Sequence, residues 1–111
     1  MYNLNNLKVI SRYISRYNSK IYNKNKINYM IKKKKNLIKQ YDYITTSIFH
    51  YKLLNKRDLY ITNKINQLTN SLSIVIHSLD KIEEEEKLIM RVFKISNFSI
   101  INCLNNYFYQ S

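Results

Sequence analysis

The stretch that decides the fold runs from Ile61 to Phe93 and reads ITNKINQLTNSLSIVIHSLDKIEEEEKLIMRVF. Its apolar residues follow one another in alternating steps of four and three, with a single gap at Glu86. They are Ile61, Ile65, Leu68, Leu72, Val75, Leu79, Ile82, Ile89 and Phe93. Because an α-helix has about 3.6 residues per turn, this spacing places them in one narrow seam. We predict a helix of about 35 residues, ~50 Å long, that packs on one or two partner helices.

The nearest partner for this seam is a second amphipathic helix, predicted over about residues 29–54. Its inward residues are Ile31, Leu37, Ile38, Tyr41, Ile44, Ile48, Tyr51 and Leu54. Between the two helices, Asn55 suits a left-handed cap and Asp58 suits the N-cap of the next helix. The two helices then form either an antiparallel hairpin or, if the helix continues through Asn55, one rod. The seam packs either within this chain or on another subunit.

The N-terminal segment, residues 3–22, is predicted to form an amphipathic helix of its own. Leu7, Ile10, Ile14, Tyr17 and Ile21 share one side, and the opposite side is basic: Lys8, Arg12, Arg16 and Lys20. Residues 23–28, NKNKIN, are polar and are predicted to form a turn. A short final helix is expected over about residues 99–109, after an end to the long helix at Ser96 and Asn97. The predicted fold class is therefore all-α, an elongated helical subunit.

Charge is distributed very unevenly along the 111 residues, whose net charge is +12. Residues 1–41 contain eleven Lys or Arg and no acid, whereas residues 42–111 contain eight bases and seven acids. We divide the chain there into a basic helical arm, 1–41, and a helical hairpin with a C-terminal helix, 42–111, within one structural unit. An AT-rich codon bias explains much of the lysine and asparagine content, but it does not explain 41 residues without an acid.

The composition excludes several kinds of site. The chain has no Gly, which excludes a P-loop and a dinucleotide-binding fingerprint, since both need backbone without a Cβ beside phosphate. Its single Cys excludes an internal disulfide and a cysteine-based zinc site. His50, His77 and Cys103 stand alone in the sequence. We therefore assign no catalytic residue, no metal, no cofactor and no small-molecule substrate, and we expect no enzyme. Without Gly, we expect Asn to occupy backbone positions of positive φ.

The sequence contains two runs of like charge, one acidic and one basic. The acidic run Glu83 to Glu86 is interpreted as a solvated helix face, with docking onto the chain's own Lys32 to Lys35 as the alternative. Glu86 lies on the apolar seam, so the seam either opens there or brings a cationic partner to it. The four consecutive lysines cover every side of a helix, so they do not all lie on one dry face.

The basic arm is interpreted as a nucleic-acid-binding segment. The residues chosen for phosphate contacts are Lys8, Arg12, Arg16, Lys20, Lys32, Lys33, Lys34 and Lys35. Tyr13, Tyr17, Tyr22 and Tyr29 lie among them and could stack on unpaired RNA bases. The same pattern also suits an anionic membrane surface, docking on protein, or a plain solvated face. An acid-free N-terminus with Arg and Ser is also typical of mitochondrial transit peptides.

These observations favour a structural, non-catalytic subunit of a large assembly. The first hypothesis is an organellar, most directly mitochondrial, ribosomal protein that contacts rRNA through its basic N-terminal segment and neighbouring subunits through its long helix. This is an analogy with ribosomal proteins, which are commonly small and basic. The alternative is an accessory structural subunit of a mitochondrial respiratory-chain or ATP-synthase complex, with the basic arm on lipid headgroups or on protein. A viral or bacterial nucleic-acid-binding module is the third. AT-rich composition is typical of organelle-encoded genes.

Overall fold

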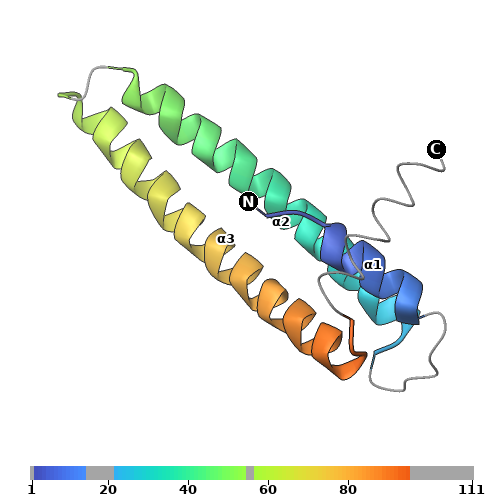
Figure 1. Ribbon diagram of the computed structural model, residues 1–111. Helices are drawn as coiled ribbons and strands as arrows, with labels where there is room; N and C mark the ends of the chain where they lie inside the picture. The colour runs from blue at the N-terminus through green and yellow to red at the C-terminus, as the bar shows by residue number, and fades with distance from the viewer. Residues whose placement is uncertain (1, 15–21, 55–56, 96–111) are drawn as a thin grey trace, which may run out of the picture.

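The computed structural model describes residues 2–14, 22–54 and 57–95, and within these ranges it contains three α-helices and no strand. They are α1 (Asn5–Ile14), α2 (Lys24–Lys52) and α3 (Leu59–Val92). α2 and α3 form a long antiparallel hairpin, and α1 lies against the end of the hairpin that holds the start of α2 and the end of α3 (Figure 1). The molecule is all-α and elongated, and the hairpin is the arrangement observed rather than one rod.

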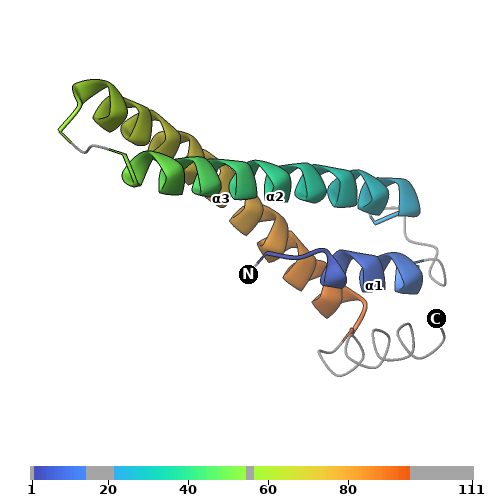
Figure 2. The same ribbon diagram turned by 90° about the horizontal axis from the view of Figure 1, so that it is seen from above.

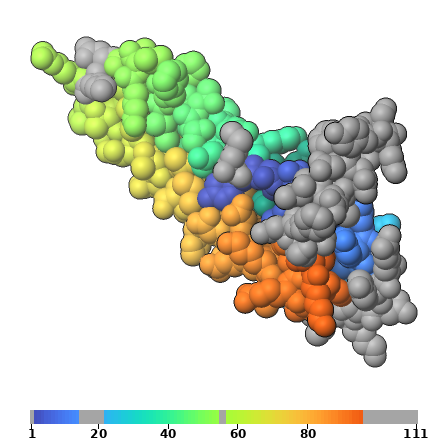
Figure 3. Space-filling view, viewed as in Figure 1, coloured from blue at the N-terminus to red at the C-terminus, as the bar shows by residue number. Residues whose placement is uncertain are grey.

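Two apolar clusters hold the helices together. At the three-helix end, α1 contributes Leu7, Val9, Ile10 and Ile14, which pack with Ile27, Met30, Ile82, Ile89, Met90 and Ile95. Further along the hairpin, a smaller cluster joins α2 to α3 through Ile44, Ile48, Val75 and Leu79. The axes of α2 and α3 cross, and α1 lies alongside them where they separate (Figure 2). α1 therefore completes a three-helix core at one end, and the other end projects as a two-helix arm (Figure 3).

The apolar seam of α3 lies along these clusters. Its buried members are Ile61, Val75, Leu79, Ile82 and Ile89. The half-buried members are Ile65, Leu68, Leu72 and Phe93. Leu68 and Leu72 pack against the cluster that includes Ile44 and Ile48 of α2. The seam thus finds its partner helix within this chain over most of its length.

The start of α2 differs from the sequence prediction. The polar segment 23–28 was predicted to form a turn, but α2 already begins at Lys24. Asn23 caps the helix, since its side-chain Oδ1 accepts a hydrogen bond from the backbone N–H of Lys26 at 2.8 Å. Ile27 is fully buried in the three-helix core, and its burial outweighs the weak helix propensity of the asparagines around it.

The helix ends illustrate how a chain without glycine closes its turns. Asp58 is the N-cap of α3, as the sequence predicted, and its Oδ1 accepts a hydrogen bond from the backbone N–H of Tyr60 at 2.9 Å. At the other end Lys94 adopts a φ of 54°, although we expected asparagine at such a position. The N–H of Lys94 donates to the carbonyl of Arg91, and that of Ile95 to Met90, which is a Schellman motif. Burial of Ile95 accompanies it, so α3 ends at Val92 rather than at Ser96.

Other predictions lie partly or wholly outside the described residues. α1 confirms a helix over the first part of segment 3–22, but residues 15–21 are not described. The predicted cap at Asn55 and the predicted final helix over residues 99–109 lie entirely outside the described ranges.

Candidate nucleic-acid interface

The four consecutive lysines of α2 have different environments. Lys34 points into the protein and is only 1% exposed, and its Nζ donates a 2.6 Å hydrogen bond to Oε1 of Glu86, which is also 1% exposed. Oε1 of Glu83 lies 3.7 Å from the same ammonium. Of the two alternatives left open at Glu86, the structure therefore shows the cationic partner, which is Lys34. Since it is enclosed by the fold, we leave Lys34 out of the candidate interface, although the sequence had placed it there.

This buried pair also reaches α1. Desolvation raises the pKa of Glu86, while the hydrogen bond and the charge of Lys34 oppose that rise, as does a side-chain hydrogen bond from Asn6. Asn6 belongs to α1, Lys34 to α2 and Glu86 to α3, so one carboxylate bonds to side chains of the other two helices. The acidic run is therefore partly engaged with this chain's own lysines, and Glu85 adds a 3.9 Å ion pair with Lys26.

The remaining predicted phosphate-binding residues that the structure describes are exposed. Lys8 and Arg12 lie four residues apart on the outer side of α1, opposite its buried residues. Lys32, Lys33 and Lys35 of α2 are also exposed. Arg16 and Lys20 are outside the described residues.

The outer side of α2 carries a stripe that the sequence analysis missed. Tyr29, Lys32, Asn36, Lys39 and Tyr43 follow one another in steps of three, four, three and four, and all are exposed. We call these five residues the outer stripe. Lys35 lies next to it, three residues after Lys32 and four before Lys39. The same spacing that reveals a buried seam also reveals an exposed one, so periodicity among polar and tyrosine residues could have found it.

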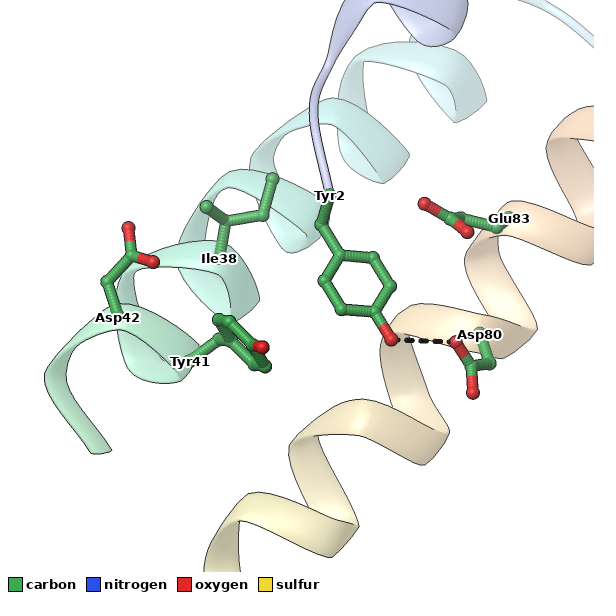
Figure 4. Close-up of a pocket in the computed structure, with 6 residues that line it drawn as sticks. All are labelled: Tyr2, Ile38, Tyr41, Asp42, Asp80 and Glu83. Carbon is green, nitrogen blue, oxygen red and sulfur yellow. Dashed lines mark hydrogen bonds between the residues drawn. The ribbon is translucent and has the colours of Figure 1, made fainter. Parts of the chain in front are cut away.

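A hollow on a different side of the hairpin has the opposite charge. It has a volume of about 520 Å³ and is lined by Tyr2, Ile38, Tyr41, Asp42, Asp80 and Glu83 (Figure 4). The hydroxyl of Tyr2 donates a 2.8 Å hydrogen bond to Oδ1 of Asp80, and its ring meets that of Tyr41 edge-on at 5.5 Å between centroids. The hydrogen bond to the carboxylate is the main cause that raises the pKa of Tyr2 to about 12. Tyr2 thereby anchors the N-terminal segment to both long helices, and the carboxylates make this side unsuited to phosphate.

Within the described ranges, no three or more His, Cys, Asp or Glu side chains come close enough together to hold a metal ion. His50 and His77 are both exposed, and Cys103 lies outside those ranges. Among the three helices described, none combines the length and the hydropathy needed to cross a membrane.

Comparison with known proteins adds no family. No protein-family model matches the chain. Neither the curated proteins nor the solved structures yielded a significant match.

Proposed function

We propose that this protein is a structural, non-catalytic subunit of an organellar, most directly mitochondrial, ribosome, and that it contacts rRNA through its basic N-terminal third. One observation carries the proposal. Within residues 2–14 and 22–41, every Lys and Arg except Lys34 is exposed, and that part of the chain contains no acid. The apolar sides of α1 and α2 meanwhile pack in the core, so the bases are presented on a rigid support.

The physical basis is the release of counterions from a polyanion. Each phosphate neutralised by Lys or Arg releases condensed cations, so affinity falls steeply as salt increases. The exposed lysines lie on helices that core packing already holds folded before RNA binds. Binding therefore costs less conformational entropy than it would for a disordered basic segment. In this proposal the two-helix arm acts as a strut toward neighbouring subunits.

The binding test compares two variants that lose equal charge. Lys32→Gln, Lys35→Gln and Lys39→Gln together remove bases from the outer side of α2. The control removes exposed bases from α3 through Lys81→Gln, Lys87→Gln and Arg91→Gln. The first variant is expected to reduce the slope of log affinity against log salt by about 0.7 per lost phosphate contact on single-stranded RNA, and the control by much less. Equal losses would show that net charge alone governs binding and would contradict the proposal.

The assembly itself is tested by sedimentation of a native extract in mild detergent, with and without RNase. The proposal expects the chain to sediment with a large ribonucleoprotein particle and to be released by RNase. If RNase does not change the sedimentation of the chain, the ribosomal function is contradicted.

A second candidate is an accessory subunit of a respiratory-chain or ATP-synthase complex, with the basic surface on anionic lipid headgroups. The observation that favours it is a group of exposed large apolar residues where α2 ends and α3 begins: Phe49, Leu53, Leu54, Leu59 and Tyr60. Such a group suits an apolar neighbour. Co-sedimentation with a detergent-solubilised complex that is insensitive to RNase would replace the first function with this one.

A further inference from the structure

The outer stripe ends beside a second hollow, whose chemistry differs from that of the acidic one. This hollow has a volume of about 430 Å³ and is lined by Lys39, Gln40, Tyr43, Ile44, Leu68 and Ser71. Its lining contains one cation and no acid. Ile44 and Leu68 supply an apolar floor between α2 and α3, while Gln40 and Ser71 supply hydrogen-bonding groups. Its size lies within the range of about 300–1,000 Å³ that is usual for sites of small organic ligands.

Both tyrosines of the outer stripe are well exposed. Tyr29 is 66% exposed and Tyr43 is 72% exposed, and each presents its aromatic ring to solvent beside lysines. Among the described residues, ring contacts join Tyr2 to Tyr41, Tyr22 to Phe93 and Phe49 to His50, and none of them uses Tyr29 or Tyr43. The rings of Tyr29 and Tyr43 are therefore available to a partner, and the stripe that joins them spans about 21 Å along the helix.

We propose that this side of α2 binds a single-stranded segment of RNA, with one base stacked on Tyr43 in the hollow and the adjoining phosphates on Lys39, Lys35 and Lys32. This inference rests on the proposed function and adds the form of RNA that is recognised. Aromatic rings beside a basic track are the arrangement by which proteins hold single strands, since every base has a π-face. Tyr29 provides a second stacking position at the far end of the stripe.

Duplex RNA does not fit this surface as well. In an A-form helix the bases are stacked on one another, and the major groove is too deep and narrow for side chains to read. A tyrosine on the convex surface of an α-helix reaches a base face only when the base is unpaired. The lysines alone would bind a duplex through its phosphates, so the tyrosine and its hollow are what should distinguish the two forms.

The experiment uses the full chain and measures fluorescence anisotropy with a labelled oligouridylate and with a blunt RNA duplex of equal phosphate number. Tyr43→Ala is expected to weaken binding of the single strand about fivefold or more. Tyr43→Phe keeps the ring and should bind like the wild type. The matched control is Tyr60→Ala on α3, which removes a tyrosine of similar exposure, 63%, at another place on the surface. None of the three substitutions should change the affinity for the duplex.

The outcomes separate this inference from the function on which it rests. If Tyr43→Ala binds the single strand as tightly as the wild type, while both retain steep salt dependence, base stacking in the hollow is wrong and RNA binding by the lysines remains. If the wild-type chain binds neither RNA, both proposals fall. Crosslinking of a 4-thiouridine oligonucleotide to the peptide that contains Tyr43 would support the inference, and crosslinks confined to other segments would overturn it.

Discussion

Lys34 and Glu86, which are 52 residues apart in the sequence, form a buried ion pair with an Nζ–Oε1 distance of 2.6 Å. The pair lies between α2 and α3 beside α1, where Asn6 also bonds to the carboxylate. A charge in this environment is stable only opposite its partner, because each ion has lost most of its hydration. The pair therefore penalises any sliding of α2 along α3 that would separate the two side chains.

Breaking this pair on one side is expected to destabilise the fold strongly. Glu86→Gln leaves the buried ammonium of Lys34 with only Glu83, at 3.7 Å, and Lys34→Met leaves the carboxylate of Glu86 without its cation. Each should lower the free energy of unfolding by about 3–5 kcal/mol, measured by urea denaturation. The double variant Lys34→Met, Glu86→Leu replaces the pair with apolar side chains. Its free energy of unfolding should equal or exceed that of the wild type, or fall below it by no more than about 1 kcal/mol.

Lys35→Met is the matched control, because the neighbouring lysine is exposed and its loss should change stability by no more than about 0.5 kcal/mol. A double variant whose loss of stability equals the sum of the two single losses would show that the two residues act independently.

The pair also makes stability depend on pH in a defined direction. Burial raises the pKa of Glu86 above its ordinary value of 4.5, so the folded state retains this proton at pH values where the unfolded state has lost it. The contribution of Glu86 to stability is therefore largest below about pH 4.5 and declines as pH rises through its folded pKa. The free energy of unfolding of the wild type, relative to the Lys34→Met, Glu86→Leu variant, should fall as pH rises above about 4.5. A rising difference would mean that Lys34 holds the folded pKa of Glu86 below 4.5.

Tyr2 is expected to anchor the N-terminal segment through Asp80. Tyr2→Phe removes the hydroxyl that donates to Asp80 and should lower the free energy of unfolding by about 0.5–1.5 kcal/mol. Asp80→Asn keeps an acceptor but removes its charge, so the pKa of Tyr2 should move from about 12 toward 10.0, as measured by NMR of ring-labelled tyrosine. A pKa of Tyr2 that does not respond to Asp80→Asn would contradict the hydrogen bond.

The end of α3 offers a stabilising substitution. Lys94 has a φ of 54°, where a side chain with a Cβ is disfavoured by about 1–2 kcal/mol relative to glycine. Lys94→Gly should therefore raise the free energy of unfolding by about 1 kcal/mol, measured by thermal or urea denaturation. Lys94→Ala keeps the Cβ and should give no such gain. Lys87→Gly, in the interior of the same helix, should instead lower the free energy of unfolding by about 1 kcal/mol.

The sequence predicted the three helical segments and the long seam, because period-3.6 spacing is a local property of the chain. It also predicted the cap at Asp58 and marked Glu86 as a place where the seam either opens or meets a cation. It misplaced the start of α2, since Asn-rich residues resemble a turn until the burial of Ile27 is known. It also placed Lys34 with its exposed neighbours, because a run of four lysines gives no sign of which one faces inward.

The sequence by itself therefore determined roughly where the helical segments lie, which sides of those helices are apolar, and that the first 41 residues carry a large positive charge. Only the tertiary structure decided that α1 packs where the hairpin opens, that Lys34 meets Glu86, and that Tyr43 lies beside a hollow shared with Leu68 and Ser71. The physical reason is that helix periodicity is fixed by neighbours within one or two turns. Which helix sides pack together depends instead on how much apolar surface residues far apart in the chain can bury against one another.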